Sequence, residues 1–351
     1  MVVRAERAAK CMSFERVLSV GGTEVVDASM GLAPRKVSVP VGDGTNAVEE
    51  VEVYAPAAWS DRAVTIAAGK YMRRAVGRVE GSSTPSLQRE THLGKVVLRI
   101  VNAIALAGVR QGYFGAALIS ATLPCGEAEL PPAAQVFRDE LYVVLLRQYA
   151  AFNSPVWFNC GLFEAYGAYS DSSNYAWSET GERVKPVANA YARPQCSACF
   201  IQSVDDSIES IYGLIGTEAK LFKHGSGTGT NFSTIRGKDE PLSGGGRSSG
   251  LMSFLHAFDA GAGALKSGGV TRRAAKMVCL DLDHPEIGAF VTWKAREEKK
   301  ARALIAAGYS AEFEGEAYRT VSGQNSNTSV RIGDAFMKAL LDNVPAVPAH
   351  T

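Results

Sequence analysis

Residues 195–235 read QCSACFIQSVDDSIESIYGLIGTEAKLFKHGSGTGTNFSTI, and this stretch decides the fold class of the chain. SACFIQSV (197–204) and GTNFSTI (229–235) have the apolar and β-branched content of strands. The residues between them have the apolar spacing of an amphipathic helix, with Gly225 as its stop. A strand, a helix and a strand in direct succession predict an α/β architecture with parallel strands.

The same alternation continues after residue 235. Further helices are predicted at about 251–265, 285–304 and 333–342, and further strands at 275–282 and 327–332. Residues 166–195, rich in Tyr, Ser, Asn and Gly, are expected to form a connecting loop. We therefore expect residues 166–342 to contain one α/β domain.

The sequence pattern of residues 57–165 predicts a helical domain. A helical pattern runs through WSDRAVTIAAGKYMRRA (59–75), and Thr91 is expected to cap a second helix with a long apolar stripe. A third helix is predicted at 135–152, preceded by two prolines and followed by Pro155. The first 56 residues are mixed, and indicate short strands and turns without a definite arrangement.

The overall composition excludes several classes of protein. The 351 residues include 37 basic and 36 acidic side chains, a balance of +1, so no general electrostatic attraction to nucleic acid or to a membrane is expected. The chain has no signal-peptide core and no apolar stretch long enough to span a bilayer. Six irregularly spaced cysteines are not a disulfide framework. We expect a cytoplasmic protein with reduced thiols.

Two glycine-rich stretches resemble nucleotide-binding motifs but do not satisfy them. In GSGTGTN (225–231) the third glycine of a dinucleotide fingerprint would fall at Thr230. In GAGALKSGG (261–269) a P-loop would need glycine at the positions of Ala260 and Leu265. Two interpretations of these glycine-rich loops remain. Their backbone could approach a phosphate closely, or they could be ordinary turns.

The pair CSAC, Cys196 and Cys199, could be a metal clip or a redox pair. Zinc requires four ligands, and neither the other cysteines nor the scattered histidines supply a second pair, so no metal site is expected. If both residues lie in one strand, their side chains point to opposite faces about 10 Å apart, whereas a disulfide needs about 4.4–6.8 Å between Cα atoms. We therefore expect the two cysteines not to pair.

Seven blocks of sequence together resemble the large catalytic chain of ribonucleotide reductases, most closely the adenosylcobalamin-dependent branch. The blocks are FNSPVWFN (152–159), QCSACFIQSVDDS (195–207), LFKHGSGTGTNFSTIRG (221–237), PLSGGGRSSGLMSFL (241–255), KSGGVTRRAAKMV (266–278), LDLDHPEI (280–287) and TVSGQNSNTSVRI (320–332). The resemblance runs from about residue 59 to residue 341 in collinear order. It implies a helical N-terminal region followed by about half of a ten-stranded α/β barrel, with 343–351 as a divergent tail.

The resemblance also implies a substrate site. Family members reduce ribonucleotides to deoxyribonucleotides by a thiyl-radical mechanism, with adenosylcobalamin as the cofactor of this branch and a thioredoxin-type protein as reductant. Cys199 matches the first of two reducing cysteines. Ser154 matches a residue that holds substrate phosphate, and Ala198, Cys199 and Gly227 match the wall behind the substrate. Cys196 is then a bystander on the opposite face of the strand.

A second nucleotide site, for a deoxynucleoside triphosphate effector, is implied as well. Its contacts match Asp206, Ser207, Ile208, Arg236, Arg272 and Arg273. The stretches 268–276 and 320–326 match the specificity loops, and such sites are found at the interface of a homodimer. Guanidinium groups pair bidentately with phosphate, although Arg272 and Arg273 are also compatible with solvated loop charges.

The chain departs from the family pattern in one respect. The radical cysteine of the family lies in an Asn-x-Cys-x-Glu loop, and the 351 residues contain no such sequence. We therefore expect this chain to be the N-terminal portion of a reductase, inactive without the missing C-terminal half or a second chain. The alternative is a nucleotide-binding fragment or subunit of a split reductase that has no catalytic role.

Overall fold

The chain divides into two compact units, Met1–Cys196 and Ser197–Thr351. The computed structural model describes residues 11–40, 48–79, 81–83, 86, 89–114, 130–171, 174–178, 183–267, 272–273, 275–311 and 315–342. The boundary between the units falls later than the predicted start of the α/β domain at residue 166. The predicted divergent tail, 343–351, lies outside the described residues.

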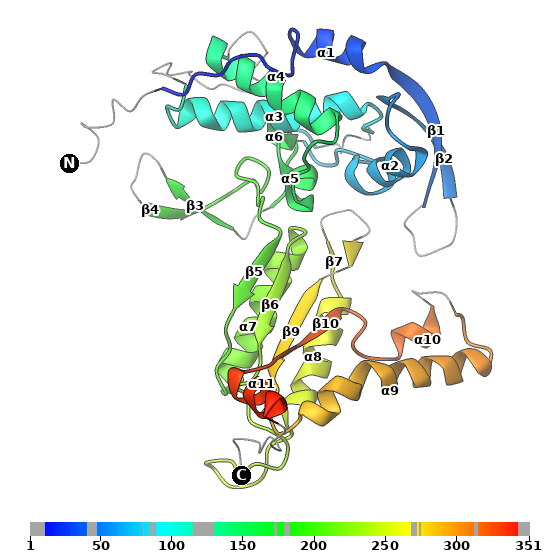
Figure 1. The fold of residues 1–351 in the computed structure, drawn as a ribbon, viewed down its shortest axis with the longest axis vertical. Helices are drawn as coiled ribbons and strands as arrows, with labels where there is room; N and C mark the ends of the chain where they lie inside the picture. The colour runs from blue at the N-terminus through cyan, green and yellow to red at the C-terminus, as the bar shows by residue number, and fades with distance from the viewer. Residues whose placement is uncertain are drawn as a thin grey trace, which may run out of the picture. The chain divides into compact units, whose positions relative to one another are not determined.

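The first unit combines helices with two small antiparallel sheets (Figure 1). Its elements are α1 (Thr23–Met30), β1 (Leu32–Pro40), β2 (Val48–Pro56), α2 (Asp61–Ile66), the π-helix η1 (Ala67–Tyr71), α3 (Leu93–Arg110), α4 (Pro132–Leu146), α5 (Ser154–Asn159), α6 (Leu162–Tyr166), β3 (Tyr175–Ser178) and β4 (Arg183–Pro186). The predicted helical region is therefore preceded by a long β1–β2 hairpin. The predicted loop at 166–195 is wrong in part, since β3 and β4 pair across it.

The apolar stripe of α3 forms the centre of the first core. Val96, Val97, Ile100 and Val101 are fully buried and pack with residues of β1, β2 and α4. The cap of α3 is His92, whose ring nitrogen accepts a hydrogen bond from the Lys95 N–H, so the prediction of Thr91 was wrong by one residue.

The helix α4 begins at Pro132, three residues before the predicted start at Gln135, and ends at Leu146, before the predicted end at Phe152. The chain turns at Gln148, which adopts a left-handed conformation with φ of 57°.

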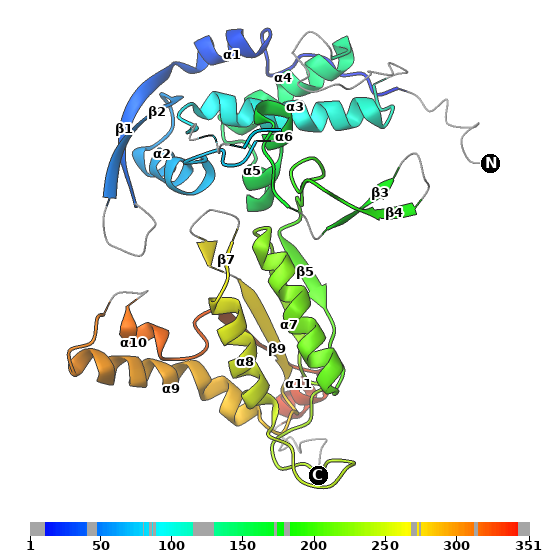
Figure 2. The same cartoon turned by 180° about the vertical axis from the view of Figure 1, so that it is seen from behind.

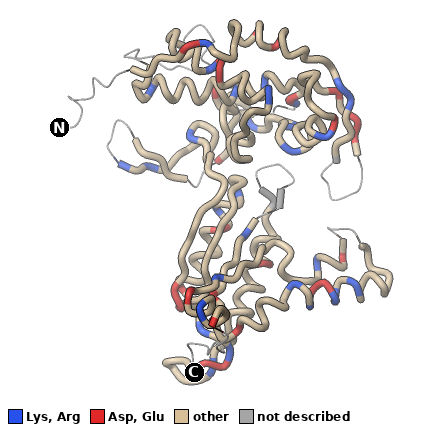
Figure 3. The backbone as a smooth tube through the Cα atoms, viewed as in Figure 1, with Lys and Arg blue, Asp and Glu red and all other residues tan. Residues whose placement is uncertain are grey.

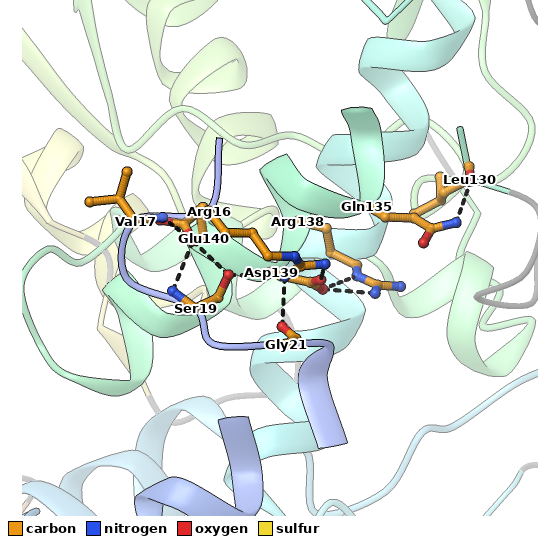
Figure 4. Close-up of polar contacts among 9 residues, drawn as sticks. All are labelled: Arg16, Val17, Ser19, Gly21, Leu130, Gln135, Arg138, Asp139 and Glu140. Carbon is orange, nitrogen blue, oxygen red and sulfur yellow. Dashed lines mark hydrogen bonds and ion pairs between the residues drawn. The ribbon is translucent and has the colours of Figure 1, made fainter. Parts of the chain in front are cut away.

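Two adjacent carboxylates of α4 hold the N-terminal segment (Figure 4). Asp139 forms an ion pair with Arg16 at 2.6 Å. Glu140 accepts hydrogen bonds from the backbone N–H groups of Val17, Leu18 and Ser19. These bonds lower the pKa of Glu140, although partial burial opposes its ionisation. The segment before α1 is thereby fixed against the helix.

The second unit is built on a four-stranded parallel sheet of order β10-β9-β6-β5, which confirms the predicted α/β architecture. Its elements are β5 (Cys199–Gln202), α7 (Ile208–Lys223), β6 (Gly227–Asn231), α8 (Leu251–Gly263), β7 (Lys266–Ser267), β8 (Arg272–Arg273), β9 (Lys276–Asp281), α9 (Ile287–Ala306), α10 (Glu316–Arg319), β10 (Ser326–Arg331) and α11 (Asp334–Leu341).

Apolar side chains join α7, α8 and α9 to the sheet. Figure 2 shows α7 and α8 side by side on one face of it. Ile211 of α7, Leu255 of α8, Val278 of β9 and Trp293 of α9 belong to one buried cluster. Within the described ranges, no helix is long and apolar enough to cross a membrane.

Candidate functional site

The predicted substrate residues fall in both units. In the first unit, Ser154 is the first residue of α5, and its Oγ lies 3.3 Å from the Tyr71 hydroxyl. The Tyr71 ring stacks on Phe158, with ring centroids 5.4 Å apart and an angle of 18° between the planes. Tyr71 ends the π-helix η1, a local widening that is frequent at functional sites. Two hydroxyl groups are therefore held side by side by aromatic packing.

Two buried arginines hold the other end of α5. Arg99 donates to the carbonyl oxygens of Cys160 and Trp157, at 2.6 and 2.9 Å, and Arg73 donates to that of Phe158 at 2.9 Å. These carbonyls at a helix C-terminus have no partner within the helix, so the guanidinium groups satisfy them. No local sequence pattern predicts this arrangement, because the partners lie more than fifty residues apart in the chain.

The charges of these arginines are compensated by Glu90. It accepts from Arg99 Nε at 2.6 Å and from the Arg73 backbone N–H at 2.8 Å, and the Tyr166 hydroxyl donates at 3.0 Å. Burial opposes ionisation of Glu90, but the Arg99 charge and these hydrogen bonds outweigh it and lower its pKa. The carboxylate stays ionised and fixes α5 in position.

In the second unit, strands β5 and β6 bring three predicted residues together. Cys199 is opposite Gly227 in the parallel register, and the Gly227 N–H donates to the Ala198 carbonyl at 2.5 Å. Cys199 is exposed while Gly227 is buried. Neither strand contains a charged residue (Figure 3). The exposed Cys199 thiol therefore lies on a pair of strands without charged residues.

Gly227 is needed for this close approach. A Cβ atom at this position would lie 2.9 Å from the Ala275 carbonyl oxygen, a backbone atom that cannot easily move. The absence of a side chain lets β6 pack between the residues before β5 and those before β9.

The prediction that Cys196 lies on the opposite face of the same strand as Cys199 is wrong. β5 begins at Cys199, and Cys196 lies in irregular residues before it, half-buried against the core of the first unit. Both cysteines are free thiols, as are Cys11, Cys160 and Cys279. Cys160 is buried, with 6% of its surface exposed.

The predicted effector residues Asp206 and Arg236 meet in the second unit. Arg236 Nε donates to Asp206 Oδ2 at 2.5 Å, and both side chains remain about one-third exposed, at 31% and 28%. Ser207 caps α7 by accepting from the Ser210 N–H at 3.2 Å, and Ile208 is the exposed first residue of that helix.

Other predicted effector elements are described only in part. Arg272 and Arg273 form β8, which pairs with β7, and nothing is described of their side chains. Residues 268–271 and 274 of the first predicted specificity loop lie outside the described residues. The stretch 320–326 is held by Asp259 of α8, which accepts from the N–H groups of Gly323 and Asn325 and from the Ser326 hydroxyl.

Sequence reasoning missed a buried ion pair beneath β6. Lys276, the first residue of β9, contacts Glu218 of α7 at 2.6 Å, and the second carboxylate oxygen accepts from the Thr228 hydroxyl at 3.0 Å. The ammonium lies 3.7 Å from the centre of the Phe258 ring. Burial lowers the pKa of Lys276 to about 8, although Glu218 opposes the shift. One signal was present, because strand alternation puts Lys276 in phase with buried Val278 and Leu280.

Comparison with known proteins gives two family matches. The model for the ribonucleotide reductase barrel domain matches residues 197–346, beginning at the first residue of the second unit. The model for the class II vitamin B12-dependent ribonucleotide reductase matches residues 34–148.

Similar proteins carry the same description. The vitamin B12-dependent ribonucleotide reductase of Rhodopirellula baltica is 41% identical over 309 residues, which cover 88% of this chain and 28% of that protein. The one from Streptomyces clavuligerus is 40% identical over 337 residues, covering 96% and 30%. A vitamin B12-dependent ribonucleoside-diphosphate reductase of Mycobacterium tuberculosis is 35% identical over 148 residues, covering 42% and 18%. The chain spans about three-tenths of the length of the first two relatives.

Proposed function

The chain belongs to the vitamin B12-dependent ribonucleotide reductases, and from this premise we propose that residues 1–351 hold the ribonucleotide substrate and a deoxynucleoside triphosphate effector. In this proposal Cys199 is one of the two thiols that reduce the substrate. The observation that carries it is the register of β5 and β6, which sets the exposed Cys199 opposite the side-chain-free Gly227.

Each unit, taken by itself, offers groups suited to a nucleotide substrate. The hydroxyl groups of Ser154 and Tyr71 are 3.3 Å apart and offer two donors to a phosphate. Ala198 and Gly227 present backbone at the wall. The Cys199 thiol, with a second cysteine outside residues 1–351, would supply two electrons as the C2′ hydroxyl leaves as water, and the two thiols would become a disulfide. A thioredoxin-type dithiol would then reduce that disulfide.

The effector would enter at the Asp206–Arg236 pair. The Asp206 carboxylate suits a ribose hydroxyl and the Arg236 guanidinium suits a phosphate. Because these two side chains bind each other at 2.5 Å, an effector that engages both would replace their ion pair. Arg272 and Arg273 are proposed as further phosphate contacts, and the site as one that two copies of the chain share.

The cofactor of the family is assigned to no described residue of this chain. The described residues contain no group of three or more His, Cys, Asp or Glu side chains that could hold a metal ion. The buried His284 uses both ring nitrogens within its own unit, with Ile235 O at 2.8 Å and the Glu286 N–H at 3.1 Å. We derive no step through adenosylcobalamin from these residues.

The proposal is tested by calorimetric titration of the purified chain with each of the four deoxynucleoside triphosphates. At least one is expected to bind, and Arg236→Ala should weaken that binding at least about tenfold through loss of a charge-assisted phosphate contact. Arg302→Ala, at an exposed pair on α9, is the matched control and should bind normally. No binding by the wild type, or equal binding by Arg236→Ala, would remove the effector site.

The non-catalytic alternative is favoured by one observation, the absence of an Asn-x-Cys-x-Glu sequence from the 351 residues. We propose that residues 1–351 alone bind nucleotides without reducing them. Turnover by the purified chain with adenosylcobalamin and a dithiol would contradict this. When the chain is extended by a relative's remaining sequence, Cys199→Ser should abolish reduction, and Cys279→Ser should not. Unchanged reduction by Cys199→Ser would favour a non-catalytic role.

A further inference from the structure

Cys160 and Cys196 are 36 residues apart in the sequence, but their thiol groups are hydrogen-bonded to each other in the first unit. Cys160 directly follows α5 and is buried in the main core, and Cys196 packs against the same core. The adjacent residues are joined as well, because the Asn159 side-chain amide donates to the Gln195 carbonyl at 2.8 Å. The residues that directly precede the two cysteines are therefore bonded to each other.

The two thiols are chemically unequal. Cys160 donates its S–H to the Cys196 sulfur, which raises the pKa of Cys160, and burial raises it further. The same hydrogen bond lowers the pKa of Cys196, although burial and Glu164 oppose this shift. Cys196, which is only half-buried, is thus the thiol that ionises first and that a small molecule can reach.

Glu164 of α6 is the third member of this cluster. Its charge acts on both cysteines, and burial raises its own pKa. Its Oε2 atom is buried, and in the part of the chain that the structure describes it has no hydrogen-bond partner. A buried carboxylate oxygen without a partner beside two thiols is available to receive a proton.

We propose that Cys160 and Cys196 form a reversible disulfide by exchange with a low-molecular-weight disulfide, with Glu164 as the proton acceptor for the second step. The Cys196 thiolate attacks one sulfur of the small disulfide, forms a mixed disulfide and releases one small thiolate. Cys160 then passes its proton to Glu164 and attacks the Cys196 sulfur, releasing the second small thiolate. Two protein thiols are oxidised and one small disulfide is reduced to two thiols.

The bridge would join the end of α5 to the residue that immediately precedes the second unit. Cys199 follows Cys196 by three residues, so the disulfide would restrict the segment that leads into β5. Disulfide formation between Cys160 and Cys196 requires no reductase role for Cys199. Within the residues that the structure describes, Cys160, Cys196 and Glu164 do not form a group that could hold a metal ion, so we do not propose a metal site.

The purified chain is incubated with mixtures of oxidised and reduced glutathione, alkylated, digested and analysed by mass spectrometry. A peptide linked through Cys160 and Cys196 is expected, and excess reduced glutathione should remove it. Cys279→Ser should leave its yield unchanged. Failure to find this peptide when other thiols are glutathionylated, or a predominant Cys196–Cys199 link, would overturn the proposal.

Three variants test the order of steps and the role of Glu164. Cys160→Ala should stop at a mixed disulfide on Cys196, whereas Cys196→Ala should leave Cys160 largely unmodified. Glu164→Gln should slow closure of the mixed disulfide at least about tenfold, with circular dichroism verifying the fold. Glu298→Gln, on the exposed face of α9, is the control. Closure at the wild-type rate in Glu164→Gln would exclude Glu164 as the proton acceptor.

Discussion

Two buried ion pairs, one from each unit, differ in how many groups they hold. Arg99 and Glu90 in the first unit have side chains 1% and 3% exposed, and Lys276 and Glu218 in the second have 0% and 3%. Arg99 also satisfies two carbonyl oxygens at the end of α5. Lys276 contacts a single carboxylate oxygen and lies over the rings of Phe258 and Phe232.

The difference follows from the chemistry of the two cations. A guanidinium has five donors in a fixed plane and stays charged, so it can hold several backbone groups at every ordinary pH. An ammonium is a compact charge whose pKa falls when it is buried, and that of Lys276 is lowered to about 8. The buried cation of the first unit, Arg99, therefore stays charged, whereas that of the second unit, Lys276, titrates at a pH of about 8.

Removal of Arg99 should have the largest effect. Arg99→Met leaves Glu90 as a buried charge and the Cys160 and Trp157 carbonyls without their donor, so the free energy of unfolding should fall by about 3–5 kcal/mol. Urea denaturation followed by circular dichroism measures it. Arg302→Met at an exposed pair should change stability by less than about 0.5 kcal/mol. A loss of under about 1 kcal/mol at Arg99 would mean that the network does not support α5.

Both pairs should make stability rise with pH, but in different pH ranges. Glu90 has a lowered pKa, so its contribution is present above its unfolded pKa of about 4.3 and is lost as pH falls through the folded value. Lys276 has a pKa of about 8 when folded and about 10.4 when unfolded. It binds fewer protons in the folded chain between these values, so stability should rise there by up to about 3 kcal/mol.

The Lys276 effect is measured as the difference in urea stability between wild type and Lys276→Met at several pH values from about 7 to 10. Wild type should gain on the variant as pH rises through about 8. A difference that is constant over this range would show that Lys276 does not titrate there.

A substitution at Gly227, whose backbone lies beside the residue preceding Lys276, should have an intermediate effect on the free energy of unfolding. Gly227→Ala puts a Cβ 2.9 Å from the Ala275 carbonyl oxygen, and the resulting strain should cost about 1–3 kcal/mol. Gly213 of α7 has open space around it, so Gly213→Ala is the matched control and should stabilise the helix by about 0.5–1 kcal/mol. Equal unfolding midpoints for Gly227→Ala and wild type would show that the strands can move apart.

The smallest effect is expected when both members of the Lys276 pair are replaced. Lys276→Met with Glu218→Gln removes both charges but retains an acceptor for Thr228, so stability should change by less than about 1 kcal/mol. Arg99→Met with Glu90→Gln should remain clearly destabilised, because the α5 carbonyls still lack their donor. Equal losses in the two double variants, measured by urea denaturation, would erase the difference between the pairs.

The sequence predicted what local patterns determine. The helix α7, its stop at Gly225 and the parallel strands on either side follow from apolar spacing within one stretch. The pair β3–β4 was missed because its short strands are polar and exposed, with little apolar alternation. Asp206 and Arg236 were proposed for one site from the resemblance, and they meet at 2.5 Å.

The contacts that the sequence did not predict are long-range. Arg99 meets Cys160 across 61 residues and Lys276 meets Glu218 across 58, and no periodicity relates such positions. The same holds for the contact between Cys160 and Cys196. Cys196 precedes β5, so only its predicted place on that strand is wrong, and its role as a bystander in reduction stays a prediction. Site residues that depend on a distant partner therefore emerged only with the fold.

Each unit contains a tryptophan whose fluorescence can report on a region of interest. In the first unit, the Trp157 ring lies 5.9 Å from that of Tyr71, whose hydroxyl faces Ser154. In the second, the buried Trp293 donates its indole N–H to Ser322, within the stretch 320–326. Variants that retain only one of these tryptophans would separate the fluorescence of the two regions, so that a nucleotide arriving at either could be followed in real time without an attached dye.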